Sequence, residues 1–280
     1  MSKDKNSMTL AEQLCYITTL IETQETDGNN YTATGFFIEF YTDKGMPMVF
    51  LVTNRHVVEN ALKMKIRLNY ADEQGNPIDT QWVNIEIENA KSQFMYHPDK
   101  DVDLAICTMS YAINIVRNKQ NIFFKSFPPA FFVTDDWAEN LDAIEDIIMV
   151  GYPYGLYDKT NNRPIVRKGI TATDPKVDYE GKKIFFIDCA CFPGSSGSPV
   201  LVHRKRVREI TPQATTFKEI SKLVGIQKSM PIAEGRSKSH KDVRFNQPIN
   251  LGHVIKAQCL FDFIPLIEEE FGITIDKSFL

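Results

Sequence analysis

Short apolar segments, separated by clusters of glycine, asparagine and aspartate, run along most of the chain. They are rich in β-branched and aromatic residues, a composition typical of β-strands. Strands are predicted over residues 14–21, 31–40, 47–54, 64–69, 81–87, 103–109, 130–134, 146–152, 164–173, 183–189, 198–203, 223–228 and 250–255. So many short strands with few helical intervals predict an all-β barrel or sandwich.

A helical pattern is confined to two places. Residues 256–271 carry apolar side chains near helical spacing, with glutamates at 268–270. A shorter helical turn is predicted over residues 57–62. The polar stretch 229–247 contains glycine, serine, lysine and proline, which predicts a long loop, and residues 112–128 are expected to cross between two halves.

The length and composition are those of an ordinary globular protein. A chain of 280 residues with 43% hydrophobic and 24% charged residues fits one large domain, or two small barrels that pack together. The net charge of −4 argues against a nucleic-acid-binding protein, which would carry a clustered basic surface. The one short basic run, residues 203–208, is expected to be a solvated loop.

The cysteines bear on compartment and on metal binding. An odd number at irregular spacing argues against a disulfide framework. The pair Cys189 and Cys191 has no second pair to complete a structural zinc site, so we expect no metal and no cofactor. No signal peptide or membrane span is evident, which predicts a soluble, cytoplasmic protein without a membrane partner. The cysteines are Cys15, Cys107, Cys189, Cys191 and Cys259.

Three polar residues stand where apolar strands begin or end. His56 follows one strand, Asp103 opens another, and Ser196 lies between Gly194 and Gly197 ahead of a third. A serine hydroxyl becomes a good nucleophile when a base takes its proton, and a neutral imidazole does this near pH 7. A carboxylate beside the imidazole fixes its tautomer. The three residues therefore have the chemistry of nucleophilic catalysis.

Each motif alone has a plainer interpretation. A histidine after a strand is more often structural, an aspartate before a strand is usually a turn residue, and a Gly-Ser-rich segment is usually a loop. Asp101 competes with Asp103, but Asp103 is favoured because Leu104, Ala105 and Ile106 follow it directly. The hydrolase pattern Gly-x-Ser-x-Gly is absent, since Ser198 occupies the last glycine position.

The order and separation of the three segments resemble the trypsin-like (chymotrypsin-like) peptidase family. The likeness includes its bacterial members, among them the HtrA proteases. Three further segments, residues 150–155, 223–226 and 251–255, resemble the turn that opens the family's second barrel, its substrate strand and its last barrel strand. The three main motifs are Thr53-Asn54-Arg55-His56-Val57-Val58, Asp103-Leu104-Ala105 and Gly194-Ser195-Ser196-Gly197-Ser198-Pro199.

This resemblance implies an all-β chymotrypsin fold of two six-stranded antiparallel Greek-key barrels with a C-terminal helix. Residues 1–280 would form a single peptidase domain, with the first barrel over about 14–115, the second over 128–255 and the helix over 256–271. It would be a stand-alone domain of the bacterial type, similar to an HtrA protease domain without a PDZ module.

The implied activity is that of a serine endopeptidase. His56, Asp103 and Ser196 would form the catalytic triad and react through an acyl-enzyme intermediate. The backbone N–H groups of Gly194 and Ser196 would form the oxyanion hole. The alternative is a latent or non-catalytic module that uses the same fold to bind peptides. A protein or peptide substrate is the expected partner, and neither that substrate nor a regulator can be named from the sequence.

The resemblance also places the pocket for P1, the substrate residue before the cleaved bond. Ala190 would lie at its base, where members specific for arginine or lysine carry aspartate. A basic P1 side chain would then lack a counter-charge, whereas a small or medium apolar one gains roughly 1 to 3 kcal/mol from burial. Asp188 is the residue that could reverse this preference. The expected lining is Ala190, Cys191, Phe192, Lys228, Ser229 and Met230.

One departure from the secreted members concerns maturation. Those members carry an aspartate just before the nucleophile, which pairs with a new N-terminus after zymogen cleavage. This chain has Ser195 there. We therefore expect no maturation by cleavage of that kind.

Overall fold

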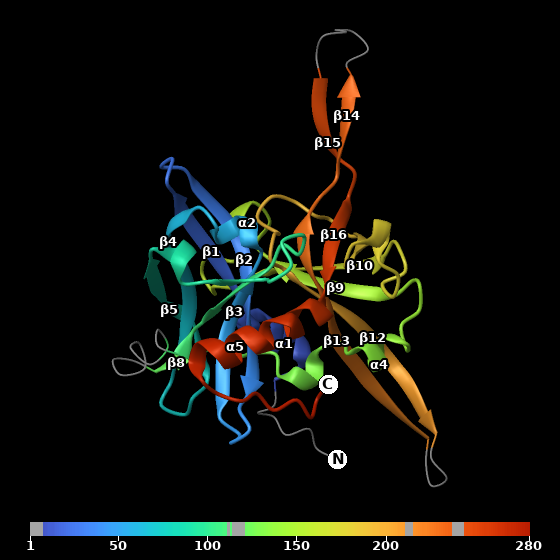
Figure 1. Ribbon diagram of the computed structural model, residues 1–280, viewed down its shortest axis with the longest axis horizontal. Helices are drawn as coiled ribbons and strands as arrows, with labels where there is room; N and C mark the ends of the chain where they lie inside the picture. The colour runs from blue at the N-terminus through green and yellow to red at the C-terminus, as the bar shows by residue number, and fades with distance from the viewer. Residues whose placement is uncertain (1–7, 111–112, 114–120, 211–214, 237–243) are drawn as a thin grey trace.

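The chain folds into a twisted β-sheet and a closed β-barrel that pack side by side (Figure 1). The computed structural model describes residues 8–110, 113, 121–210, 215–236 and 244–280. At 205–210, 215–218, 233–236 and 244–248 the description covers the backbone alone.

The first half is an antiparallel sheet of eight strands. Seven of them follow the order β5-β4-β1-β2-β3-β7-β6, and β8 pairs with β4. β5 pairs with β4 alone, so this sheet stays open along that edge. The strands are β1 (Thr18–Glu25), β2 (Asn30–Tyr41), β3 (Pro47–Thr53), β4 (Ala61–Ala71), β5 (Pro77–Glu88), β6 (Met95–Tyr96), β7 (Ala105–Thr108) and β8 (Ile122–Phe123).

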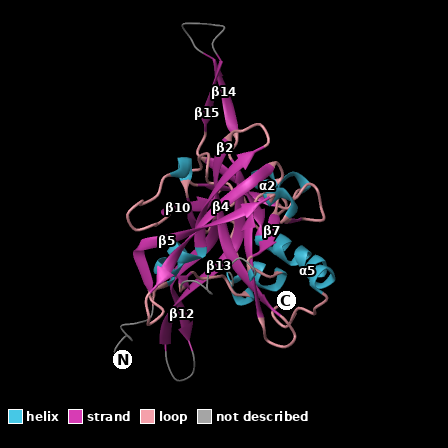
Figure 2. Ribbon diagram, turned by 90° about the vertical axis from the view of Figure 1, so that its left-hand side faces the viewer, coloured by secondary structure: helices cyan, strands magenta, loops and turns pink. Residues whose placement is uncertain are grey.

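The second half is a closed six-stranded barrel in the order β10-β11-β16-β13-β12-β9. The β12–β13 hairpin runs far beyond the barrel, and a separate β14–β15 hairpin projects in roughly the opposite direction (Figures 1 and 2). The strands are β9 (Asp146–Gly151), β10 (Ile165–Thr171), β11 (Ile184–Asp188), β12 (Pro199–Ile210), β13 (Thr215–Ser229), β14 (Ile232–Arg236), β15 (Arg244–Pro248) and β16 (Leu251–Lys256).

The helices are short. Among the described residues, none is long and apolar enough to span a bilayer. The α-helices are α1 (Leu10–Ile17), α2 (Arg55–Val58), α4 (Asp135–Ala138) and α5 (Ile264–Phe271). The 3₁₀ helices are η1 (Ala90–Ser92), η2 (Pro129–Phe131), η3 (Pro153–Gly155), η4 (Tyr179–Gly181) and η5 (Ala257–Phe263).

One hydrophobic core joins the two halves. Its fully buried side chains come from the first sheet, from the barrel and from the C-terminal helices, for example Phe36, Leu201 and Phe263. Burying a side chain of this size stabilises the fold by about 1.5–3 kcal/mol. Because the halves share this core, they hold the loops between them in fixed relative positions.

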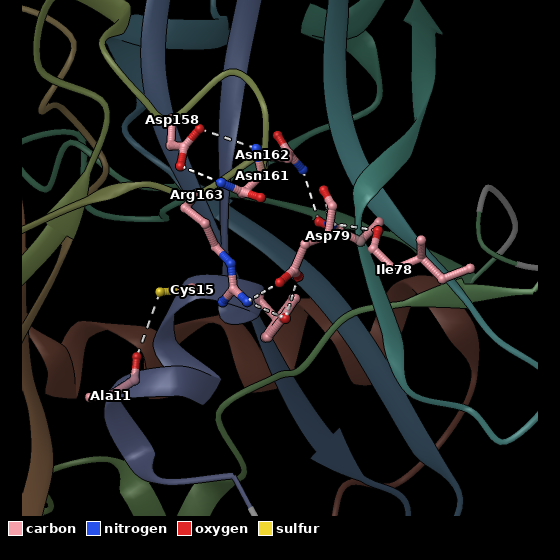
Figure 3. A network of polar contacts seen from close by, with 10 residues as sticks. Ala11, Cys15, Ile78, Asp79, Asp158, Asn161, Asn162 and Arg163 are labelled. Carbon is pink, nitrogen blue, oxygen red and sulfur yellow. Dashed lines mark hydrogen bonds and ion pairs between the residues drawn. The ribbon is translucent and has the colours of Figure 1, made fainter.

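A polar network forms a second link between the halves (Figure 3). The Arg163 guanidinium, from the loop between β9 and β10, donates to the hydroxyl of Tyr16 on α1 and to the carboxylate of Asp79 on β5, at 2.5 and 2.8 Å. The Tyr16 hydroxyl in turn donates to Asp79 at 2.6 Å. In this network the Arg163 charge therefore has a carboxylate partner.

The predicted fold class is confirmed. The chain is mostly β, the second half is a six-stranded antiparallel barrel, and a helix ends the fold. That helix begins as η5 and becomes α-helical only at Ile264, where Pro265 occupies the first turn. The first half departs from the expected six strands because the short strands β6 and β8 add to the sheet.

Four local predictions are wrong. Residues 14–17 belong to helix α1, because Thr9 and Glu12 form a capping box that starts a helix there. Residues 203–208 are part of strand β12, and residues 130–134 contain η2 instead of a strand. Within the predicted loop 229–247, β14 and β15 form a hairpin. Much of the predicted crossover 112–128 lies outside the described residues.

Candidate active site

His56 lies at the edge of the first sheet, in the short helix α2 that follows β3. Two groups beside it fix the backbone: the Asn54 side-chain amide and the Arg55 N–H both donate to the carbonyl oxygen of Asp103, at 2.9 and 3.3 Å. These bonds tie the segment that carries His56 to the segment that leads into β7.

The carboxylate of Asp103 binds His56 twice. Its Oδ2 lies 2.7 Å from the imidazole Nδ1, and its Oδ1 accepts from the His56 backbone N–H at 3.0 Å. Because a carboxylate only accepts, a neutral imidazole at this position carries its hydrogen on Nδ1 and keeps the lone pair on Nε2. The Asp103 side chain is 14% exposed and the His56 side chain 44%. This is a base oriented by a shielded carboxylate. By contrast, Asp101 is exposed and makes no contact with His56 among the described residues.

Ser196 follows a tight turn at residues 192–195. The Ser195 N–H donates to the Phe192 carbonyl at 2.9 Å, and Gly194 adopts φ of +87°. Proline before glycine at the two central positions is the preferred sequence of a type II turn. A Cβ on Gly194 would stand 2.4 Å from the Tyr152 carbonyl oxygen, so only glycine fits this position.

This turn orients the backbone amide of Gly194. The Pro193 carbonyl accepts from the Tyr154 N–H at 2.6 Å. Since the N–H and C=O of a trans peptide point in opposite directions, the Gly194 N–H points away from Tyr154. Neither that N–H nor the N–H of Ser196 has a hydrogen-bond acceptor among the described residues. Both N–H groups are therefore free to donate to an anion, which is the chemistry that an oxyanion hole needs.

Thr34, on β2 of the first sheet, holds the Ser196 turn against the first half. Its buried hydroxyl donates to the Gly194 carbonyl at 2.9 Å and accepts from the Tyr152 N–H at 3.1 Å. Its backbone N–H donates to the Ser196 carbonyl, also at 2.9 Å. Three bonds from one residue therefore join the halves at the site.

The backbone directly after Ser196 is close to the end of β3. A Cβ on Gly197 would lie 2.6 Å from the hydroxyl of Thr53, three residues before His56. The Ser196 hydroxyl donates to the Lys228 carbonyl at 3.1 Å, and no bond joins it to His56 among the described residues. Catalytic hydrogen bonds are often loose until substrate binds.

The sequence profile of the trypsin-like peptidase domain matches residues 33–208 of the chain. This span covers well over half of the chain and contains His56, Asp103 and Ser196. The chain belongs to the trypsin-like peptidase family. A search of curated protein sequences found no match.

Several solved peptidase structures resemble this trypsin-like peptidase at low identity. The HtrA-type protease AlgW is 16% identical with a TM-score of 0.48, over 93% of this chain and 62% of its own. Tobacco etch virus protease is 12% identical with a TM-score of 0.48, over 98% of this chain and 86% of its own. Deg5 is 14% identical with a TM-score of 0.43, over 78% and 81%. The chain therefore spans less than two thirds of AlgW.

The residues expected around P1 lie on two segments. Cys191 is fully buried, with its sulfur against the Gly252 backbone, while Ala190 is exposed and Phe192 is half-buried against Tyr154. Lys228, Ser229 and Met230, all half-buried, form and follow the end of β13. Asp188 is exposed, whereas its neighbours Ile187 and Cys189 point into the barrel core, so its carboxylate faces the other way.

One cluster of metal-ligating groups occurs among the described residues, at His97, Cys259 and Asp262. The Asp99 N–H donates to His97 Nδ1 at 3.1 Å, so His97 Nε2 carries the hydrogen and donates to Asp262 at 3.1 Å. The Lys183 ammonium lies 3.1 Å from the same carboxylate oxygen. Burial raises the pKa of Cys259 to about 12, which keeps it a thiol. These groups satisfy one another, and we assign no metal to them.

Two residues of the site escaped the sequence analysis. Thr34 is a threonine within an apolar strand, and Arg167 is one of two adjacent basic residues in β10, with a guanidinium that donates to Ser195 and Ala190. Neither lies within a recognisable motif. Their contacts join positions more than 20 residues apart, so only the folded chain identifies them.

Proposed function

We propose that the chain is a serine endopeptidase in which His56, Asp103 and Ser196 form the catalytic triad. The observation that carries this proposal is the Asp103–His56 pair, which leaves the imidazole Nε2 as an oriented base. The turn that presents Ser196 beside two unengaged backbone N–H groups supports it further.

The reaction follows from these groups. The Ser196 oxygen adds to the substrate carbonyl carbon while its proton passes to His56 Nε2. The resulting oxyanion accepts hydrogen bonds from the Gly194 and Ser196 N–H groups. His56 then gives the proton to the leaving amine as the C–N bond breaks, which leaves an acyl-enzyme. Water, deprotonated by His56, hydrolyses this ester and restores Ser196.

A small or medium apolar residue is the P1 side chain that the site favours. The outward direction of Asp188 supports this choice, because it leaves no carboxylate on the inner face to pair with arginine or lysine. The Arg167 guanidinium, bonded to the Ala190 carbonyl, adds a charge of the same sign as a basic P1. Lining by Ala190, Cys191, Phe192, Lys228, Ser229 and Met230 stays part of this proposal.

The organisation and the compartment are also proposals. Residues 1–280 would be one peptidase domain, divided into barrels at about 14–115 and 128–255 with a helix at 256–271. A reducing compartment such as the cytoplasm is supported by the five cysteines, all of which are free thiols.

Reaction with a fluorophosphonate tests the nucleophile directly. We expect the wild type to gain one adduct, located at Ser196 by mass spectrometry of its peptides, and Ser196→Ala to gain none. Ser198→Ala is the matched control, because Ser198, like Ser195, is close to Ser196 in the chain and fully buried. An adduct on either neighbour would refute the assignment. Cleavage of a peptide library mainly after arginine or lysine would refute the apolar P1.

A non-catalytic peptide-binding module is the second candidate. The observation that favours it is the bond from the Ser196 hydroxyl to the Lys228 carbonyl in place of His56. This function predicts that the wild type resists the fluorophosphonate yet binds peptides as tightly as Ser196→Ala. Equal binding without acylation would favour the module, and single-site acylation would exclude it.

A further inference from the structure

The Arg167 guanidinium lies behind the turn that presents Ser196. From β10 it donates through Nη1 to the Ala190 carbonyl at 2.7 Å and to the Ser195 hydroxyl at 2.8 Å. One nitrogen thus holds both sides of the segment between residues 190 and 195.

No counter-charge accompanies this cation among the described residues. Its Nε and Nη2 are buried without a hydrogen-bond partner. The nearest ionisable groups are the thiols of Cys189 and Cys191, and burial raises the pKa of both, that of Cys191 to about 12. Both are therefore neutral near pH 7. Arg167 is half-buried, and withdrawing part of an unpaired charge from water is unfavourable, so Arg167 is not explained by a contribution to stability.

The Ser195 hydroxyl connects Arg167 to the turn at residues 192–195. It is fully buried, and it also accepts from the Phe192 N–H at 3.4 Å. The Ser195 N–H closes the same turn by donating to the Phe192 carbonyl. Arg167 therefore anchors the residue at which the two bonds of the turn meet, directly before Ser196.

We propose that Arg167 is a positioning residue: its guanidinium fixes the 190–195 segment so that the Gly194 N–H faces the oxyanion. This inference rests on the proposed peptidase function. Ser195 carries a hydroxyl and no carboxylate, so Arg167 does not form an ion pair with it. The contact consists of two charge-assisted hydrogen bonds, one to the Ser195 hydroxyl and one to the Ala190 carbonyl. The turn would then be held without any cleavage of the chain.

Kinetics of Arg167→Met test the proposal, with Arg167→Lys as the conservative variant. Losing one oxyanion donor lowers kcat by about 10²–10³-fold, and we expect a loss of this size in Arg167→Met with little change in KM. Arg167→Lys should recover part of kcat, because an ammonium can still donate to one of the two oxygens. Unchanged kcat in Arg167→Met would overturn the proposal.

Stability separates positioning from a structural role. Removing an unpaired buried charge should leave the free energy of unfolding unchanged or higher in Arg167→Met. Arg163→Met is the matched control, since Arg163 is paired with Asp79 away from the turn. It should lower stability and keep kcat. Loss of kcat only in proportion to unfolded protein would contradict our assignment.

Amide hydrogen exchange of residues 192–196 provides a readout that does not depend on catalysis. We expect exchange to accelerate at least tenfold in Arg167→Met and to stay unchanged in Arg163→Met. Unaltered exchange at the turn would refute the role of Arg167. If the wild type is not acylated, the peptidase proposal fails, while this measurement still decides whether Arg167 holds the turn.

Discussion

The two sides of the site are held in different ways. The His56 side is local: its supports are Asn54, Arg55 and Asp103, all within the first half of the molecule. The Ser196 side takes its supports from three separate elements. These are Thr34 on β2, Tyr154 after β9 and Arg167 on β10.

This difference teaches which part of the site depends on the fold as a whole. The His56–Asp103 pair needs the first sheet alone. The turn before Ser196 needs the sheet and the barrel in contact, because the Thr34 hydroxyl bonds across them. Substitutions far away in sequence should therefore disable the Ser196 side and leave the His56 side intact.

The largest expected effect tests the local side. Asp103→Asn should cut kcat by about 10⁴-fold without unfolding the protein, since the wrong imidazole tautomer would face Ser196. Steady-state cleavage of a peptide substrate measures this loss. Asp101→Asn is the control and should change kcat little, because its exposed side chain makes no contact with His56. A greater loss in Asp101→Asn would reverse the choice between the two carboxylates.

The next effect tests the fold-dependent side. Thr34→Val leaves the buried Tyr152 N–H and Gly194 carbonyl without their partner, which should cost about 2–6 kcal/mol at 1–3 kcal/mol for each group. Chemical denaturation measures this cost, and the rate of fluorophosphonate acylation should fall with it.

Thr19→Val is the matched control for Thr34→Val. The buried Thr19 hydroxyl also bonds two backbone groups, the N–H and carbonyl of Arg67, but within the first sheet. It should lose comparable stability while the remaining folded protein acylates normally. If both variants acylate at the wild-type rate, the Ser196 turn does not depend on the contact between the halves.

A smaller expected effect is the pH dependence of stability, which tests whether the two halves unfold together. Burial raises the pKa of Cys107, in the first half, and of Cys191, in the second, to about 12 from an ordinary value of 9.0. Below pH 9 both thiols are protonated in both states, so their contribution to stability is fully present. As the pH rises from 9 to 12 the unfolded chain ionises first, and that contribution is lost.

Each thiol should therefore lower the free energy of unfolding by about 1.4 kcal/mol per pH unit in that range. Denaturation under reducing conditions at pH 8 and 10.5 measures this slope. Cys107→Ala and Cys191→Ala should each reduce the slope by the same amount if the halves form one cooperative unit. A reduction seen in only one of them would show separate unfolding.

Thiol labelling of the native protein gives the smallest effect. Cys15 on α1 is partly exposed, whereas the other four cysteines are buried. A water-soluble maleimide should therefore modify Cys15 first, and Cys107 and Cys191 only through opening of the structure. Equal rates at these two positions would agree with a single unit, and faster labelling of Cys191 would indicate a barrel that opens alone.

Sequence motifs located much of the site because its chemistry is encoded locally. His56 and Asp103 stand at strand ends, and the folded chain brings them within 2.7 Å. The Pro193–Gly194 pair specifies a turn, and that turn is found. The fold class can also be predicted from the sequence, because the spacing of apolar residues that indicates a strand is a local pattern.

The remaining features depend on long-range contacts or on weak local signals. Thr34 and Arg167 look ordinary within their strands, and their roles arise from partners elsewhere in the chain. The apolar run beginning at Leu14 predicts a strand, whereas the capping pair Thr9 and Glu12 starts helix α1, which continues to Ile17. The hairpin β14–β15 was mistaken for a loop because its sequence lacks apolar alternation.

The bond from Thr34 to Gly194 also has a consequence for the order of folding. β2 precedes the barrel in the chain, so the Thr34 hydroxyl cannot bond to the Gly194 carbonyl until a further 160 residues have been synthesised. The His56–Asp103 pair can form as soon as the first half is complete, whereas the turn before Ser196 gains its bonds to Thr34 only after the barrel has been synthesised. Under the proposed function, a nascent chain would therefore stay inactive until both halves have docked.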